Sequence, residues 1–261
     1  MTQKSGSGVT SKSGSGLVVL TAMDEESVAL RSMLERPSQR DVGGVGIASG
    51  VLAGTEVHLV SSGIGKVAAA AAAATAILEL EPALLVVVGL AGGLSAGAEP
   101  GTLVVVSEAI QHDFDLRPLL PRRGLLPQFW SVSLKADRAA LDPLESSSRS
   151  VLAGAPTAGR VMRGGVLSGD QIIADEAVKA ALVDEFPGAA CVDMETAAVA
   201  QVASGHRVPW GSVRLVSDFA DDSFDAANVL GYCAEVGARL MAEVVADFTS
   251  SWMGRRTAMP G

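Results

Sequence analysis

Unbroken apolar runs alternate with stretches of helical periodicity along most of the chain, and this alternation constrains the fold more than any other feature. Residues 84–88 read Leu-Leu-Val-Val-Val, which is typical of a central strand covered on both faces. Strands that alternate with helices form a parallel or mixed sheet between two helical layers. We therefore expect an α/β fold, namely a single-domain, three-layer αβα sandwich whose central sheet is mixed and mainly parallel.

The expected elements also indicate where a ligand would bind. Strands are expected at residues 17–21, 45–51, 55–61, 84–88, 102–109, 190–192 and 213–217. Helices are expected at residues 25–34, 66–80, 195–204 and 226–249, and a further helix is expected to end at 182–186. Residues 45–61 have the pattern of a hairpin around Leu52-Ala-Gly54. Ligands of such folds bind at the carboxyl ends of the strands, so residues that follow strands are the candidates for a site.

The domain organisation is simple. The chain has 261 residues, of which 48% are hydrophobic, enough for one large core, and no second domain is visible. The sequence Lys-Ser-Gly-Ser-Gly occurs at residues 4–8 and again at 12–16, and such a composition buries nothing. We expect a flexible tail over residues 1–16, one domain over 17–253 and a second tail over 254–261.

Composition excludes several classes of protein. With 29 acidic against 20 basic residues, the chain lacks the basic surface that nucleic-acid binding requires. Its two cysteines and three histidines provide neither a disulfide framework nor metal-ligand spacing. The longest apolar stretch, residues 67–80, is mostly alanine and shorter than the roughly 20 residues of a membrane span. The opening residues are polar and glycine-rich, unlike a signal peptide. We expect a cytoplasmic protein without metal or cofactor.

Carboxylates follow three of the expected strands. Glu26 follows the first strand, Glu195 follows the strand at 190–192, and Asp218 ends the strand at 213–217. Each has an ordinary structural explanation, because an acid in the first turn of a helix favours the helix dipole and a Ser-Asp pair can cap a turn. Residues 89–93, Gly-Leu-Ala-Gly-Gly, predict a backbone loop that either approaches a ligand or makes a tight turn. Together these features place three acids and a glycine loop at one sheet edge.

Seven short motifs together identify a protein family more specifically than any one of them does. They lie along residues 17–250 in the family's order. They are Ala22-Met-Asp-Glu-Glu26, Ser62-Gly-Ile-Gly-Lys-Val-Ala-Ala69, Leu90-Ala-Gly-Gly-Leu94, His112-Asp-Phe-Asp115, Ser168-Gly-Asp170, Val192-Asp-Met-Glu195 and Arg214-Leu-Val-Ser-Asp218. The sequence resembles the nucleoside phosphorylase and nucleosidase superfamily, above all the bacterial 5′-methylthioadenosine/S-adenosylhomocysteine nucleosidases.

That resemblance implies a nucleoside phosphorylase-like fold, a purine nucleoside substrate and a set of roles. Glu26 matches the carboxylate that activates the attacking water, and Asp218 matches the acid that protonates N7 of the leaving purine. Met194 and Glu195 match the residues that pack under the ribose and bind its hydroxyls. The other positions implied to contact the substrate or to surround the water and the acid are Met23, Ala91, Gly92, Ile172, Ile173, Val192, Arg214, Ser217 and Phe224. The family requires no cofactor.

The residues favour hydrolysis over phosphorolysis. Relatives that use phosphate place arginines against it, whereas here residues 84–90 contain no arginine and the first loop is acidic. The sequence departs from the family pattern at Leu90, Asp193 and Ile172, which leaves the 5′ group open. A phosphorylase, a nucleosidase for adenosylhopane or futalosine, and a non-catalytic nucleoside-binding homologue are the alternatives. Residues 116–130 are rich in leucine and proline and predict a homodimer in which this segment lies near the partner's active site.

Overall fold

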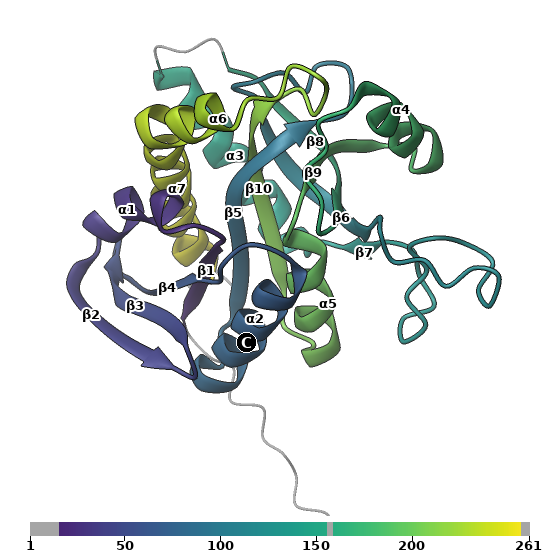
Figure 1. Cartoon of the computed structure of the whole chain (residues 1–261). Coiled ribbons are helices and arrows are strands. Elements are labelled where there is room, and N and C mark those ends of the chain that lie inside the picture. The colour runs from purple at the N-terminus through teal and green to yellow at the C-terminus, as the bar shows by residue number, and fades with distance from the viewer. Residues whose placement is uncertain (1–15, 156–158, 257–261) are drawn as a thin grey trace, which may run out of the picture.

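The computed structural model describes residues 16–155 and 159–256 (Figure 1). The strands are β1 (Leu17–Thr21), β2 (Glu35–Val42), β3 (Val45–Leu52), β4 (Thr55–Ser61), β5 (Leu84–Gly93), β6 (Leu103–Gln111), β7 (Leu134–Lys135), β8 (Val161–Ser168), β9 (Ala189–Asp193) and β10 (Trp210–Asp218). The helices are α1 (Asp24–Ser32), α2 (Lys66–Leu80), α3 (Arg138–Gly154), α4 (Glu176–Glu185), α5 (Thr196–His206), α6 (Ala226–Tyr232), the π-helical turn η1 (Cys233–Gly237) and α7 (Ala238–Arg256). Most of the two expected tails lies outside the described residues, although α7 continues to Arg256.

Two groups of parallel strands form the centre of the sheet. In the first group β4, β1, β5 and β10 pair in parallel, and in the second β6, β8 and β9 do so. The groups meet in antiparallel pairs, β10 with β6 on one side and β5 with β9 on the other. Strands β5, β10, β6, β8 and β9 therefore form a closed ring, from which β1, β4, β3 and β2 extend as an open branch. The expected mixed sheet is confirmed.

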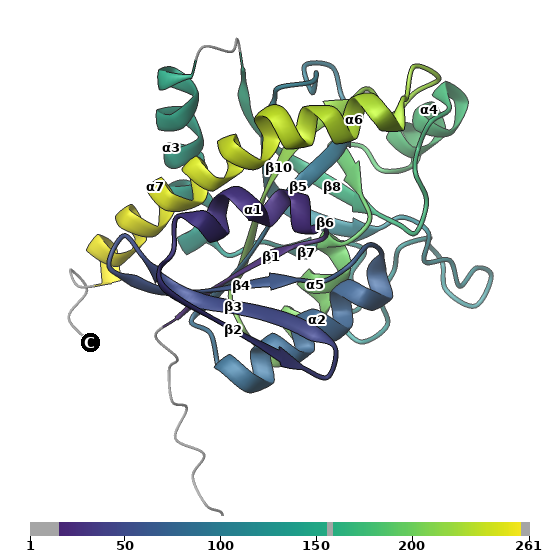
Figure 2. The same ribbon diagram turned by 60° about the vertical axis from the view of Figure 1, so that its left-hand side comes forward.

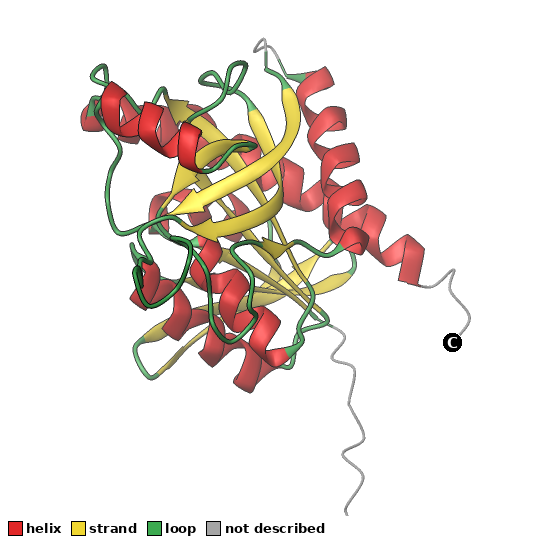
Figure 3. Ribbon diagram, turned by 90° about the vertical axis from the view of Figure 1, so that its right-hand side faces the viewer, coloured by secondary structure: helices red, strands yellow, loops and turns green. Residues whose placement is uncertain are grey.

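Helices cover both faces of this sheet, as expected for a three-layer sandwich (Figure 3). Helices α2 and α5 pack against each other on one side, and α1, α3 and α7 pack on the other (Figure 2). Alanines make the α2–α5 contact close, because Ala72, Ala76, Ala200 and Ala203 are all fully buried. Residues 84–88 are buried as expected of a central strand. The chain thus forms one domain around one main core.

Four elements of the fold have no counterpart among the expected ones, the two-residue strand β7 and three longer elements. Strand β2 is polar and exposed, β8 contains two adjacent glycines, and α3 contains Pro143 and a run of serines, so neither strand nor helix periodicity marks them. Residues 89–93 were expected to form a loop, but they are the second half of β5. They stay in the sheet because β10 pairs with residues 89–92 and β9 pairs with Gly92 and Gly93.

Two further observations concern the whole described chain. Along residues 16–155 and 159–256, no helix is both long enough and apolar enough to cross a membrane. Cys191 and Cys233 are free thiols, and both are buried. Burial raises the pKa of the Cys233 thiol to about 11, so it stays protonated at neutral pH.

Candidate active site

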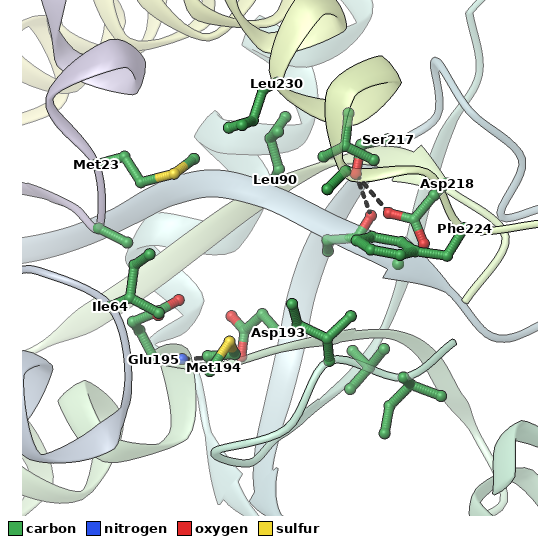
Figure 4. A pocket seen from close by; sticks show the side chains of 18 of the residues that line it. Met23, Ile64, Leu90, Asp193, Met194, Glu195, Ser217, Asp218, Phe224 and Leu230 are labelled. Atoms are coloured by element: carbon green, nitrogen blue, oxygen red, sulfur yellow. Dashed lines mark hydrogen bonds between the residues drawn. The ribbon is translucent and has the colours of Figure 1, made fainter. Parts of the chain in front are cut away.

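A cavity of about 280 Å³ lies where the carboxyl ends of β1, β5, β9 and β10 meet (Figure 4). Its floor comes from these strands, and its rim comes from the turn before α2, the segment before α4, and α6. The lining residues are Ala22, Met23, Glu26, Ile64, Leu90, Ala91, Gly92, Gln171, Ile172, Ile173, Val192, Asp193, Met194, Glu195, Ser217, Asp218, Phe224, Ala226, Val229 and Leu230. The expected position at the strand ends is therefore found.

The structure brings twelve of the thirteen sequence-predicted site residues to this wall: Met23, Glu26, Ala91, Gly92, Ile172, Ile173, Val192, Met194, Glu195, Ser217, Asp218 and Phe224. Arg214 is the exception, because it lies behind the wall and is fully buried. The prediction did not include the eight other lining residues, Ala22, Ile64, Leu90, Gln171, Asp193, Ala226, Val229 and Leu230. Ile64 lies inside a quoted motif and could have been found, whereas nothing in the sequence marks the residues of α6.

Glu26 is held as an acceptor by the backbone. Its Oε2 accepts hydrogen bonds from the N–H groups of Ala22 and Met23 at 2.9 and 3.0 Å, and its Oε1 accepts from the N–H of Leu90 at 3.0 Å. The side chain is 3% exposed. The geometry thus presents a fixed carboxylate at the end of β1.

Asp218 lies at the end of β10, just after a register shift between Val216 and Asp218. The Ser217 hydroxyl donates to its Oδ2 at 2.7 Å, and the N–H of Ala220 donates to its Oδ1 at 2.9 Å. Gly92 on the neighbouring strand makes room for it, since a Cβ there would stand 3.1 Å from Asp218 Oδ1 and 2.9 Å from the Cβ of Ala220. Asp218 is half-buried and faces the cavity.

Glu195 lies between β9 and α5. The N–H of Gly65 donates to its Oε1 at 2.9 Å, which ties it to the turn before α2. Burial and the neighbouring Asp193 carboxylate raise the pKa of Glu195 to about 7. At neutral pH this group therefore exists in both protonation states.

Arg214 is the cation shared by these acids. Its Nη2 stands 2.7 Å from Asp193 Oδ2 and 3.9 Å from Glu195 Oε2, and its Nη1 donates to the Leu90 carbonyl at 3.4 Å. Burial opposes the charge, but the carboxylates of Asp193, Glu195 and Glu26 outweigh it and raise the pKa of Arg214. Arg214 thus stays charged behind a wall of acids.

The wall itself carries four carboxyl groups, on Glu26, Asp193, Glu195 and Asp218, and no lysine, arginine or histidine. Within the described part of the chain, His, Cys, Asp and Glu form no group of three that could hold a metal ion. The cavity therefore favours positive charge in whatever it binds.

Apolar side chains form the other end of the cavity. Figure 4 shows Met23, Leu90 and Leu230 on one side, away from Asp218 and Phe224, with Glu195 and Met194 below them. Leu230 and Ile64 remain half exposed or more, at 50% and 61%. The site thus joins an acid at one end to an open apolar region at the other.

Comparisons with known proteins identify the family of this chain. The phosphorylase superfamily model matches residues 17–250. The 5′-methylthioadenosine/S-adenosylhomocysteine nucleosidase from Neisseria meningitidis, in complex with methylthio-immucillin-A, is 31% identical with a TM-score of 0.84, over 91% of this chain and 99% of that chain. The corresponding nucleosidase from Colwellia psychrerythraea, in complex with adenine, is 28% identical with a TM-score of 0.79, over 90% and 96%.

A third solved structure, the futalosine hydrolase of Helicobacter pylori, is 25% identical with a TM-score of 0.79, over 90% of this chain and 97% of that chain. All three similarities extend over nearly the whole length of both chains. The chain therefore belongs to the phosphorylase superfamily, and within it to the nucleosidases, enzymes that hydrolyse N-glycosidic bonds.

Proposed function

We propose that this enzyme hydrolyses the N-glycosidic bond of a 5′-substituted adenosine, of the 5′-methylthioadenosine or S-adenosylhomocysteine type, to free adenine and the sugar. The observation that carries the proposal is the cavity wall, which has four carboxyl groups, no basic side chain and an apolar end. N-glycosidic cleavage passes through a sugar with oxocarbenium character. Carboxylates around the sugar stabilise that positive charge.

Glu26 is the proposed general base. Its three backbone hydrogen bonds fix its position, so it can take a proton from a water molecule that attacks the anomeric carbon. Arg214 behind it places a positive charge near the carboxylate.

Asp218 is the proposed general acid. It lies at the end of the cavity that also holds Phe224, where an aromatic ring can lie against a flat base. A proton delivered to N7 lets the purine leave as a neutral molecule. Ser217 and the N–H of Ala220 orient the carboxyl group for that transfer.

Glu195 and the apolar end select the sugar and its 5′ group. An ionised Glu195 can accept hydrogen bonds from two ribose hydroxyls, and Met194 lies beside it in the wall. At the other end, Met23, Leu90 and Leu230 fit an apolar 5′ substituent such as an alkylthio group.

The same wall supports hydrolysis rather than phosphorolysis. A phosphate dianion needs bidentate donors such as arginine, and the arginine nearest to the cavity already pairs with Asp193 at 2.7 Å. The ionised carboxylates of the wall repel the dianion but not a water molecule.

The direct test is to incubate the enzyme with 5′-methylthioadenosine in phosphate-free buffer and to identify both products by chromatography. We expect adenine and free methylthioribose, with no acceleration when phosphate is added. A sugar 1-phosphate that forms only with phosphate would identify a phosphorylase instead. Failure to release a base from any nucleoside would favour the non-catalytic homologue.

A panel of 5′-substituted nucleosides then tests the substrate class. It should include S-adenosylhomocysteine, adenosine, inosine and futalosine, because a futalosine hydrolase is among the similar structures. We expect the adenosines with an apolar 5′ group to have the highest kcat/KM. A clear preference for futalosine would replace the proposed substrate while leaving the reaction class intact.

We also expect a homodimer. Within residues 116–130, Leu119 and Trp130 are 82% and 69% exposed, a degree of exposure for large apolar side chains that favours a covered surface. A second copy of the chain is the proposed cover, with this segment near the partner's cavity.

A further inference from the structure

A buried threonine that does not line the cavity holds the arginine on which the site depends. Thr196 is the first residue of α5 and is fully buried. Its hydroxyl accepts hydrogen bonds from Arg214 Nε at 3.0 Å and from Nη2 at 2.7 Å. The same hydroxyl donates to Asp193 Oδ2.

These three contacts fix the direction of the hydroxyl. A threonine hydroxyl has one proton and two lone pairs. Since Arg214 provides donors only, the lone pairs of Thr196 are used by Arg214 and its proton points to Asp193. Thr196 and Asp193 therefore both bind the Nε–Nη2 edge of the guanidinium.

The opposite edge of Arg214 points toward the base. A Cβ atom added at Gly89 would stand 2.4 Å from Arg214 Nη1 and 2.7 Å from Glu26 Oε1, so both groups approach the same backbone position. Arg214 Nη1 also donates to the carbonyl of Leu90, the residue whose N–H holds Glu26. The guanidinium of Arg214 therefore lies between Thr196 and Asp193 on one side and the Glu26 carboxylate on the other.

We propose that Thr196 is a positioning residue for hydrolysis, which acts by holding the Arg214 guanidinium against Glu26 and Glu195. This inference rests on the proposed role of Glu26 as the base. Thr196 touches neither the cavity nor a substrate, so its effect passes through Arg214. Without the hydroxyl, the nearest partner left to the Nε–Nη2 edge is Asp193, and a two-bond fork with that carboxylate draws the guanidinium away from Glu26.

The charged groups around Arg214 determine in which direction the loss of the Thr196 hydroxyl shifts the pH dependence. Arg214 faces Asp193 and Cys191 of β9, Glu195 before α5 and Glu26 of α1. Glu26 in turn faces Cys233 of η1, and Glu195 faces Asp193. Both thiols stay neutral because burial raises their pKa values. Arg214 is therefore the cation of this group. Moving it away takes positive charge from beside Glu26 and raises the pKa of Glu195, which Arg214 holds down.

The test is the pH profile of kcat/KM for Thr196→Val, which has nearly the same shape as threonine but no hydroxyl. We expect kcat/KM to fall at least tenfold at neutral pH, and the acidic limb to move upward by about one pH unit, the size of shift that a nearby opposite charge produces. Thr196→Ser keeps the hydroxyl and should restore the wild-type limb. If Thr196→Val is not recovered folded, Thr196→Ala replaces it with the same expected shift.

Thr249→Val is the matched control. Thr249 is also fully buried, but its hydroxyl donates to the Val245 carbonyl within its own helix, α7. We expect this variant to lose stability without any movement of the acidic limb. The proposal is overturned if Thr196→Val leaves the limb unmoved or lowers it, or if Thr196→Ser does not restore it. A wild-type enzyme that releases no base would instead refute the proposed function, so the two failures are distinguishable.

Discussion

Replacing Glu26 by glutamine separates a catalytic base from an acid that only favours a helix. The carboxylate of Glu26 accepts three hydrogen bonds from backbone N–H groups, two on Oε2 and one on Oε1. A glutamine amide has one oxygen and one NH₂ group, so in either orientation the NH₂ meets at least one backbone N–H. The orientation with its oxygen toward Ala22 and Met23 leaves only the N–H of Leu90 without an acceptor.

That single mismatch sets the expected loss of stability. One buried donor without a partner costs about 1–3 kcal/mol. For a chain of this size the melting temperature should then fall by about 2–12 °C. The loss of a general base should lower kcat by about 10²- to 10⁴-fold. The fold should therefore survive while hydrolysis does not.

The assay measures adenine release and a melting curve on the same preparation. Glu25→Gln is the matched control, because Glu25 lies in the same first turn of α1 but is exposed and outside the cavity wall. It removes the same charge from the same helix end, where a carboxylate stabilises the helix by about 0.3–1 kcal/mol. We expect Glu25→Gln to retain full turnover.

The reasoning fails if Glu26→Gln melts near the expected temperature and still hydrolyses at the wild-type rate. That result would assign Glu26 to the helix dipole and leave the water to another base. Equal losses of turnover in the two variants would also exclude a specific role, since only one of the two side chains reaches the cavity.

Three further predictions concern the acid, the ribose site and the assembly. Asp218→Asn should lower kcat about 100-fold or more while the protein stays folded, because the amide cannot protonate N7; near-normal turnover would remove Asp218 from the mechanism. With the pKa of Glu195 raised to about 7, KM should fall as pH rises through 7 and the carboxylate ionises, and Glu195→Gln should abolish that dependence. Sedimentation at micromolar concentration should show two 26.5 kDa chains together, and a monomer would contradict the expected dimer.

The hydrophobic pattern of the sequence predicted those strands whose residues are uniformly buried. The runs at 17–21 and 84–88 lie on interior strands and are wholly buried, so their composition reports their position directly. Strand β8 was not predicted, because it contains two adjacent glycines whose lack of a side chain serves close packing against the neighbouring strand. A Cβ at Gly164 would stand 2.3 Å from the Cβ of Ala190 on β9. Such a requirement exists only once the two strands have paired.

In the site, too, local sequence predicted some residues, whereas the placement of others depends on contacts between distant parts of the chain. Glu26, Glu195 and Asp218 were predictable because each follows a recognisable strand and lies in a family motif. The placement of Arg214 behind the wall was not, because it depends on where Asp193 and Thr196 meet it across the sheet. Sequence position indicates which residues reach a strand end, but only the packed fold determines which of them touch the cavity.

The closed ring of β5, β10, β6, β8 and β9 also bears on solubility. Strands within a ring offer no free edge to another molecule. The open branch does have one, at β2, the long outer strand of the described sheet. Its sequence, Glu-Arg-Pro-Ser-Gln-Arg-Asp-Val, places charges of both signs and a proline on that edge. Pro37 cannot donate a backbone hydrogen bond, and Arg36 before it has a left-handed backbone with φ of 51°. Strand β2 is therefore poorly suited to edge-to-edge aggregation, and apolar replacements along it should promote self-association before they affect turnover.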